Sequence, residues 1–338
     1  MKAVRDLDRP ANRRCYTVAG RFVFVDSDES VLSGLLEQLF AGWLLARVES
    51  TNQRPDVLIS CRCTRQPPEV PFGLDEFEIA EQARCYPVKE GFYLDLGNSL
   101  LQLSSSAPVK IEIWFRQIPE TVNASLARAV SFAVCAGLRR HGVFDVHGAG
   151  VLAPGSSSGV LIIGPSGSGK STLTTQLVAA GWGYLSDDEI LLSIEDDQVL
   201  ARGFRSFFAL STDAMIATGL AELEGAAAIQ PAALKACFEP RSIFASEQAH
   251  TAAARFLFFT SVAHKAQTHL TELTKTESMI RLLRACPWAT YDRDIAADNL
   301  QVLSRLAHQC RSFDLEAGSD LLVPRCADLL FRPYIESP

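Results

Sequence analysis

The sequence of 338 residues is short of basic side chains, with 32 Lys and Arg against 39 Asp and Glu and a net charge of −7. Proteins that bind nucleic acid usually present a basic stripe to the phosphate backbone, and this charge balance supplies none. The nine cysteines are scattered and include no CxxC pair, so neither a zinc site nor a disulfide framework is expected. We expect reduced thiols and no nucleic-acid partner.

Long apolar runs are lacking as well. The longest stretch without charged residues, 146–169, is interrupted by glycine, proline and consecutive small residues, which is typical of turns rather than of a membrane span. Residues 1–14 carry charges and have no apolar core of a signal peptide. The sequence therefore predicts a cytoplasmic protein that does not contact a membrane.

The length exceeds what a single hydrophobic core usually supports, so we expect two domains of the α/β class. The first, residues 1–118, is predicted as a smaller mixed α/β N-terminal module. Its pattern indicates a helix over 31–45 and strands over 18–25, 57–60, 92–96, 100–104 and 109–115. The second domain, residues 119–338, is predicted to begin with an amphipathic helix over 121–140, capped by Asn123.

Further strands and helices are predicted along the second domain. Strands are expected at 143–152, 160–163, 184–186, 189–194 and 255–261, and a helix at 170–180. Two further helices, 276–286 and 295–311, are expected to complete the fold.

The clearest motif is a phosphate loop at 164–171, which matches the pattern GxxxxGK[ST]. It lies where a predicted strand ends and a helix begins, so backbone N–H groups and the helix dipole can face an anion. Lys170 is expected to reach the β- and γ-phosphates of ATP, and the Ser171 hydroxyl to ligate Mg²⁺. The predicted nucleotide-binding residues are Gly164, Pro165, Ser166, Gly167, Ser168, Gly169, Lys170, Ser171 and Thr172.

Two adjacent acids and a histidine accompany the loop. Asp187 and Asp188 follow the next predicted strand, at the expected carboxyl end of a parallel sheet. One of them can hold Mg²⁺ together with Ser171, a role we place on Asp188, while the other accepts a proton from an attacking hydroxyl. The residue type does not distinguish the two acids, so this division stays open. His147, before Gly148 on the preceding strand, can touch a transferred phosphoryl group or orient the base.

The stretch 147–188 resembles the catalytic core of HPr kinase/phosphorylase and related serine kinases with a phosphoenolpyruvate carboxykinase-like fold. The resemblance rests on His147-Gly148, the phosphate loop, the helix closed by Gly181, and the pair Asp187-Asp188. It implies a P-loop core of that type, ATP and Mg²⁺ as cofactors, and catalytic roles for Asp187, Asp188, His147 and Lys170. It also implies assembly into a homo-oligomer.

The segment 201–207 differs from the Glu-Ile-Arg-Gly segment of HPr kinases, so the chain is more similar to HPr-kinase-related proteins, including lasso-peptide kinases. This similarity implies a peptide or protein substrate with an acceptor hydroxyl of the serine type. The N-terminal module becomes a candidate for recognising the substrate or a partner. Arg202, Arg205 and Arg241 are candidates to contact the phosphoryl group or an acidic substrate.

Other functions of a phosphate loop stay open at this point. A kinase for small metabolites, an ATPase, and a nucleotide-binding module without phosphoryl transfer share the same motif. A transport ATPase would need an LSGGQ-like signature and a GTPase an NKxD motif, and the sequence has neither.

Overall fold

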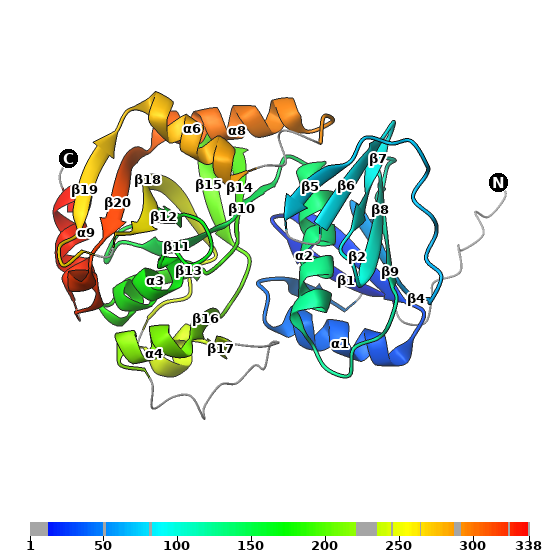
Figure 1. Ribbon diagram of the computed structural model, residues 1–338, viewed down its shortest axis with the longest axis horizontal. Helices are drawn as coiled ribbons and strands as arrows, with labels where there is room; N and C mark the ends of the chain where they lie inside the picture. The colour runs from blue at the N-terminus through cyan, green and yellow to red at the C-terminus, as the bar shows by residue number, and fades with distance from the viewer. Residues whose placement is uncertain are drawn as a thin grey trace. The chain divides into compact units, whose positions relative to one another are not determined.

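The computed structural model describes residues 13–49, 52–80, 83–220, 235–244, 246–263, 265–286, 292–323 and 325–336. Most of the segment 1–14, on which the signal-peptide expectation depends, lies outside these ranges. The chain divides into two compact units (Figure 1). The first comprises Met1–Ala41 and Leu45–His141, and the second Gly42–Leu44 and Gly142–Pro338.

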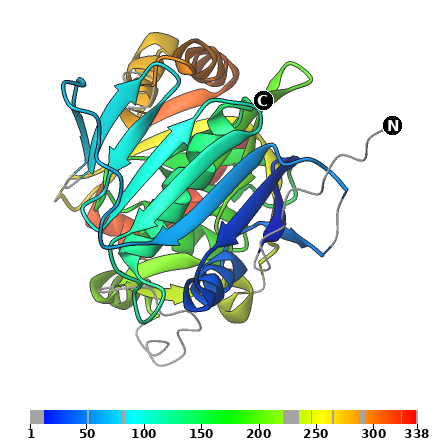
Figure 2. The same ribbon diagram turned by 90° about the vertical axis from the view of Figure 1, so that its right-hand side faces the viewer.

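In the described residues, the first unit contains a nine-stranded sheet with the order β3-β1-β2-β4-β9-β8-β7-β6-β5, which Figure 2 shows from its broad face. The strands are β1 (Arg14–Val18), β2 (Arg21–Ser27), β3 (Ala46–Val48), β4 (Val57–Cys63), β5 (Phe77–Ala80), β6 (Ala83–Val88), β7 (Gly91–Asp95), β8 (Ser99–Ser104) and β9 (Val109–Phe115). The strands β2, β4 and β9 are parallel, whereas β5 to β9 form an antiparallel meander. The single strand predicted over 18–25 is instead a hairpin, because the chain turns at Ala19-Gly20 with positive φ at both residues.

Among the described residues, α1 (Ser30–Ala41) packs on this sheet against β2, and α2 (Ala124–Arg139) packs against β4, β8 and β9. The predicted cap of α2 is confirmed, since the Asn123 side chain accepts a hydrogen bond from Leu126 N at 2.9 Å. The apolar face of α2, which includes Val130 and Val134, is fully buried. Because that face packs on the first sheet, the division between the units falls after His141, whereas the sequence placed it after residue 118.

The second unit is built on a mixed sheet with the order β10-β14-β15-β18-β12-β11-β13, to which β20 and β19 are added beside β18. The strands are β10 (Phe144–Val146), β11 (Gly148–Leu152), β12 (Ser158–Ile163), β13 (Gly183–Ser186), β14 (Ile190–Glu195), β15 (Gln198–Gly203), β18 (Thr251–Val262), β19 (His269–Leu273) and β20 (Arg311–Ala317). A separate two-stranded sheet pairs β16 (Phe208–Ser211) with β17 (Lys235–Phe238).

Helices lie on both faces of the mixed sheet (Figure 1). They are α3 (Lys170–Ala179), α4 (Thr212–Thr218), α5 (Pro240–Ile243), α6 (Lys275–Ala285), α8 (Ala296–Gln309), the 3₁₀ turn η2 (Ser319–Leu322) and α9 (Cys326–Glu336). One face carries α6 and α8, and the other carries α3 with α4 and α9 beside it. The core under α3 includes Leu177, Tyr184, Phe258 and Phe331, all fully buried. Among the helices in the described ranges, none has the length and apolar character needed to cross a bilayer.

Three expectations for this unit need correction. The strand predicted over 143–152 breaks at His147, because β10 pairs with β14 whereas β11 pairs with β12 and β13. The acids that follow β13 do not end a purely parallel sheet, since β11 lies between β12 and β13 and is antiparallel to both. The helices predicted to complete the fold are followed by β20 and α9.

Strand register brings the predicted site residues together. Gly148 pairs with Ile163 and Gly150 with Ser186, so His147 lies beside the start of the phosphate loop and near the acids that follow β13. Ile190 of β14 pairs with both Val146 and Gly203. The residues that follow β15, which include Arg205, are therefore brought close to His147.

Candidate active site

The loop between β12 and α3 leaves the amino end of the helix without a side-chain cap. Its N-cap residue, Gly169, has a φ of +87°, a left-handed conformation that glycine adopts without strain. The first N–H groups of a helix have no partner within the helix, and together with the helix dipole they form an anion site. Ser168 is buried and hydrogen-bonded to Thr260 of β18, with 3.0 Å between the hydroxyl oxygens, which holds the loop to the sheet.

Lys170 is folded across this loop. Its Nζ donates to the carbonyl oxygens of Gly164 at 2.8 Å and Pro165 at 3.0 Å, and lies 3.1 Å from His147 Nε2. The side chain is 6% exposed, so these oxygens replace the water that an ammonium group would otherwise bind. A phosphate in the loop would offer Lys170 alternative acceptors.

Ser171, the next residue of α3, contacts the first acid of the pair. Its Oγ donates to Asp187 Oδ1 at 3.0 Å, and Asp187 Oδ2 accepts from the backbone N of Ala209 at 3.2 Å. Two neighbouring ligands of an octahedral Mg²⁺ ion with bonds of about 2.1 Å lie about 3.0 Å apart. The spacing of this hydroxyl and carboxylate therefore fits a magnesium ion bound by both.

The second acid points elsewhere because the chain turns sharply at Asp188. Its φ is +69°, in the left-handed region that few non-glycine residues occupy, and Glu189 N donates to Asp187 O at 2.9 Å across the turn. The Asp188 side chain is 39% exposed and lies beside His147, whereas Asp187 is 2% exposed. The turn thus gives two adjacent carboxylates different surroundings.

The contacts of His147 settle its protonation. Nδ1 lies 2.9 Å from the carbonyl oxygen of Asp188, which can only accept, so Nδ1 carries the hydrogen. Nε2 faces the Lys170 ammonium group, which can only donate, so Nε2 is the acceptor. Loss of water around the ring lowers the pKa of His147, and Lys170 acts in the same direction, whereas Asp188 raises it. The net shift is downward, which favours the neutral ring.

Arg205 completes the group of side chains in contact at this site. Its guanidinium lies 3.1 Å from Asp188 Oδ2 and 3.4 Å from Glu189 Oε2. Burial alone would lower the pKa of Arg205, but Glu189 and Asp188 outweigh it and the pKa is raised. The backbone is fixed by Ser186, whose Oγ accepts from Arg205 N at 3.0 Å and donates to Glu189 O at 2.7 Å. Neither Ser186 nor Glu189 was predicted from the sequence, because their only signal is adjacency to the two acids.

The remaining predicted residues are placed as follows. Pro165, Ser166 and Gly167 are exposed at the tip of the loop, and Thr172 is half-buried in the first turn of α3. Arg202 lies on β15 and pairs with Glu195 on β14. Arg241 is exposed on α5, and within the described ranges we find no contact between it and this group.

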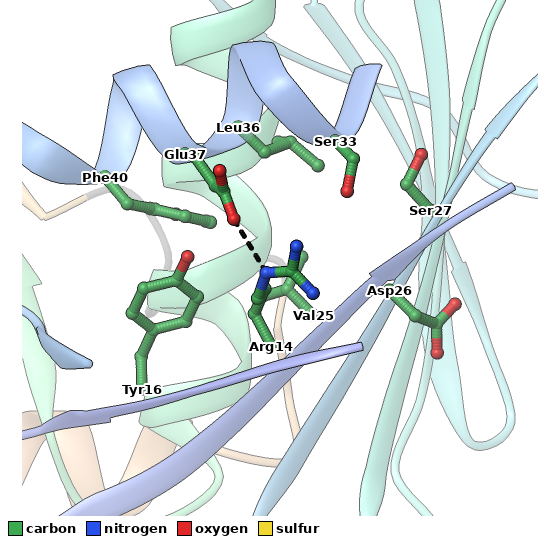
Figure 3. A pocket seen from close by; sticks show the side chains of 9 residues that line it. All are labelled: Arg14, Tyr16, Val25, Asp26, Ser27, Ser33, Leu36, Glu37 and Phe40. Carbon is green, nitrogen blue, oxygen red and sulfur yellow. Dashed lines mark hydrogen bonds and ion pairs between the residues drawn. The ribbon is translucent and has the colours of Figure 1, made fainter. Parts of the chain in front are cut away.

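The first unit contains a small pocket between α1 and the strands β1 and β2 (Figure 3). Its polar centre is occupied by an ion pair, in which Arg14 Nε donates to Glu37 Oε1 at 2.7 Å. This hydrogen bond lowers the pKa of Glu37. Since the two charges satisfy each other, we assign no ligand to this pocket.

Comparisons with known proteins leave the family open. No family model matches the chain, and no curated protein matches its sequence. Among solved structures, the HPr(Ser) kinase/phosphatase from Coxiella burnetii is similar with a TM-score of 0.25 and 18% identity. The similarity covers 34% of this chain and 58% of that protein, and at this TM-score it carries no argument about fold or function. The chain is a mixed α/β protein, and its function must be argued from the site.

Proposed function

We propose that the chain is a phosphotransferase that moves the γ-phosphoryl group of ATP to a serine hydroxyl of a peptide or protein, with Mg²⁺. One observation carries this proposal, namely the contact series that joins the phosphate loop to both acids. Lys170 touches His147, whose Nδ1 lies 3.3 Å from Asp188 Oδ1, and Ser171 touches Asp187. A loop that only began a helix would not need an ammonium group, a neutral imidazole and two carboxylates in contact.

In this proposal the loop binds the phosphates of ATP through its backbone N–H groups and Lys170. The ammonium group would exchange the carbonyl oxygens of Gly164 and Pro165 for phosphate oxygens. Ser171 and Asp187 would hold Mg²⁺, which when bound neutralises charge on the phosphates. The role falls to Asp187 in this proposal, because Ser171 Oγ donates to Asp187 Oδ1.

Asp188 is then the general base. The acceptor hydroxyl gives its proton to the Asp188 carboxylate, its oxygen forms a bond to the γ-phosphorus, and the bond from that phosphorus to the bridging oxygen breaks, releasing ADP. His147 and Arg205 hold the carboxylate from two sides, at 3.3 Å and 3.1 Å. The exposure of Asp188, 39%, and of His147, 46%, supports an acceptor as large as a peptide or protein.

The test is to incubate the full chain with Mg²⁺, γ-labelled ATP and a panel of serine-containing peptides, each paired with its serine-to-alanine version. Mass spectrometry should find one added phosphate on a serine peptide and none on its partner. The variant Asp188→Asn should lower this rate by at least about 10²-fold while ATP still binds.

Three other outcomes would each replace the proposal with an alternative. Label on small metabolites alone would indicate a metabolite kinase. Steady release of phosphate without any labelled acceptor would indicate an ATPase, and tight binding of ATP without turnover would indicate a binding module.

A further inference from the structure

A three-residue segment, Gly42–Leu44, belongs to the second unit although the residues on both sides of it belong to the first. It forms an antiparallel bridge in which Trp43 pairs with Arg205. Leu44 N donates to Phe204 O at 2.8 Å, and Ser206 N donates to Gly42 O at 3.1 Å. The segment therefore holds the backbone on both sides of Arg205.

Packing anchors this bridge. Trp43 is 5% exposed, and its ring lies against that of the fully buried Phe204 with 4.8 Å between centroids. Leu44 occupies the space beside Gly203, where an added Cβ would lie 2.6 Å from Leu44 Cδ1 and 2.2 Å from Leu185 O. Only glycine at this position allows so close an approach.

Arg205 is thus fixed from two directions. Gly42–Leu44 bonds to the residues directly before and after Arg205, and Ser186 Oγ accepts a hydrogen bond from the N–H of Arg205 itself. The side chain then reaches Asp188 and Glu189. An arginine has several rotatable bonds, so the place where its guanidinium ends depends on where its backbone is held.

We propose that Gly42–Leu44 is a positioning element for Arg205 and that Trp43 is its anchor. This inference rests on the proposed function, in which Asp188 accepts the proton of the acceptor. Trp43 packs on Phe204 and bridges to Arg205, so we place its effect on Arg205 and not on the substrate. Its loss should slow phosphoryl transfer and leave ATP affinity unchanged, because Lys170 and Ser171 are held by α3 and the loop.

The experiment is a double-mutant cycle in the full chain with Mg²⁺ and ATP, using Trp43→Ala, Arg205→Ala and the double variant. Transfer of γ-phosphate to a serine peptide, or to water where no peptide accepts it, gives the rate, and calorimetry gives the ATP affinity. We expect Trp43→Ala to reduce the rate about 10- to 100-fold and Trp43→Phe to restore most of it. In the Arg205→Ala background the same change should have no further effect.

A merely structural tryptophan would give a different result. Equal effects of Trp43→Ala with and without Arg205, or an equal loss of ATP affinity, would overturn the inference. Trp114→Ala, which removes a half-buried tryptophan from β9, is the matched control and should leave the rate unchanged.

Hydrogen exchange separates a failure of this inference from a failure of the proposed function, because it needs no nucleotide. The amides of Leu44 and Ser206 should exchange faster in Trp43→Ala than in the parent chain. If they do not, the positioning role is wrong whatever the activity. If they do, but the parent chain neither binds ATP nor transfers phosphate, the positioning holds and the kinase proposal fails.

Discussion

Replacing Lys170 with methionine keeps most of the side-chain stem and removes the ammonium group, so it tests the nucleotide site with little change in packing. A unit charge about 4 Å from a phosphate oxygen, at an effective dielectric constant of about 20, is worth about 4 kcal/mol. In the free protein Lys170 already donates to the carbonyl oxygens of Gly164 and Pro165, which it must give up. At about 1.5 kcal/mol for each hydrogen bond from a charged donor, a net loss of about 1 kcal/mol remains.

That loss corresponds to about 5-fold weaker binding of ATP. Calorimetry with ATP and Mg²⁺ measures it, and AMP serves as the control ligand because it lacks the phosphates that Lys170 is expected to reach. Lys265→Met is the matched control variant, since Lys265 is 61% exposed and pairs with Glu316. Unchanged ATP affinity in Lys170→Met, or an equal loss for AMP and ATP, would refute the reasoning.

The other predictions concern metal, protons and stability. Asp187→Asn should weaken ATP binding in the presence of Mg²⁺ and leave binding in EDTA unchanged; the same loss in both buffers would remove Asp187 from the metal site. Burial holds the pKa of His147 in the folded protein below its ordinary value of 6.5. The neutral ring therefore contributes fully to stability above pH 6.5, and this contribution is lost as the pH falls from 6.5 through the pKa of the folded state. Transfer should decline over the same range, and His147→Gln, which cannot titrate, should lack this inflection in both the rate and the unfolding profile. Asn123→Ala should lower the free energy of unfolding of the first unit by about 1 kcal/mol, measured by urea denaturation, and an unchanged midpoint would contradict the cap. Trp182→Phe removes the 2.8 Å hydrogen bond to Asp328 and should cost the second unit about 2 kcal/mol, whereas an undisturbed thermal transition would show that the bond contributes nothing.

Much of the second unit could be predicted from local pattern. The strand before the phosphate loop is fully apolar in sequence and is buried as β12, and α3 begins at the predicted Lys170. An apolar run predicts a strand buried on both faces, and the phosphate-loop motif marks the start of the helix, so both signals are local to the chain. Local pattern could not separate β10 from β11, since both are buried almost throughout and only the change of partner strand divides them at His147.

The sequence by itself supplied most of the candidate site residues, although not Ser186 or Glu189, because a motif of consecutive residues dictates its own loop and helix start. Lys170, Ser171, Asp187, Asp188 and His147 were all predicted from their local setting. Only the tertiary structure decided which of these groups contact one another. The turn at Asp188 directs one acid to Ser171 and the other to His147 and Arg205. The contact between Trp43 and Arg205 joins residues far apart in the chain, and no local pattern records such a pair.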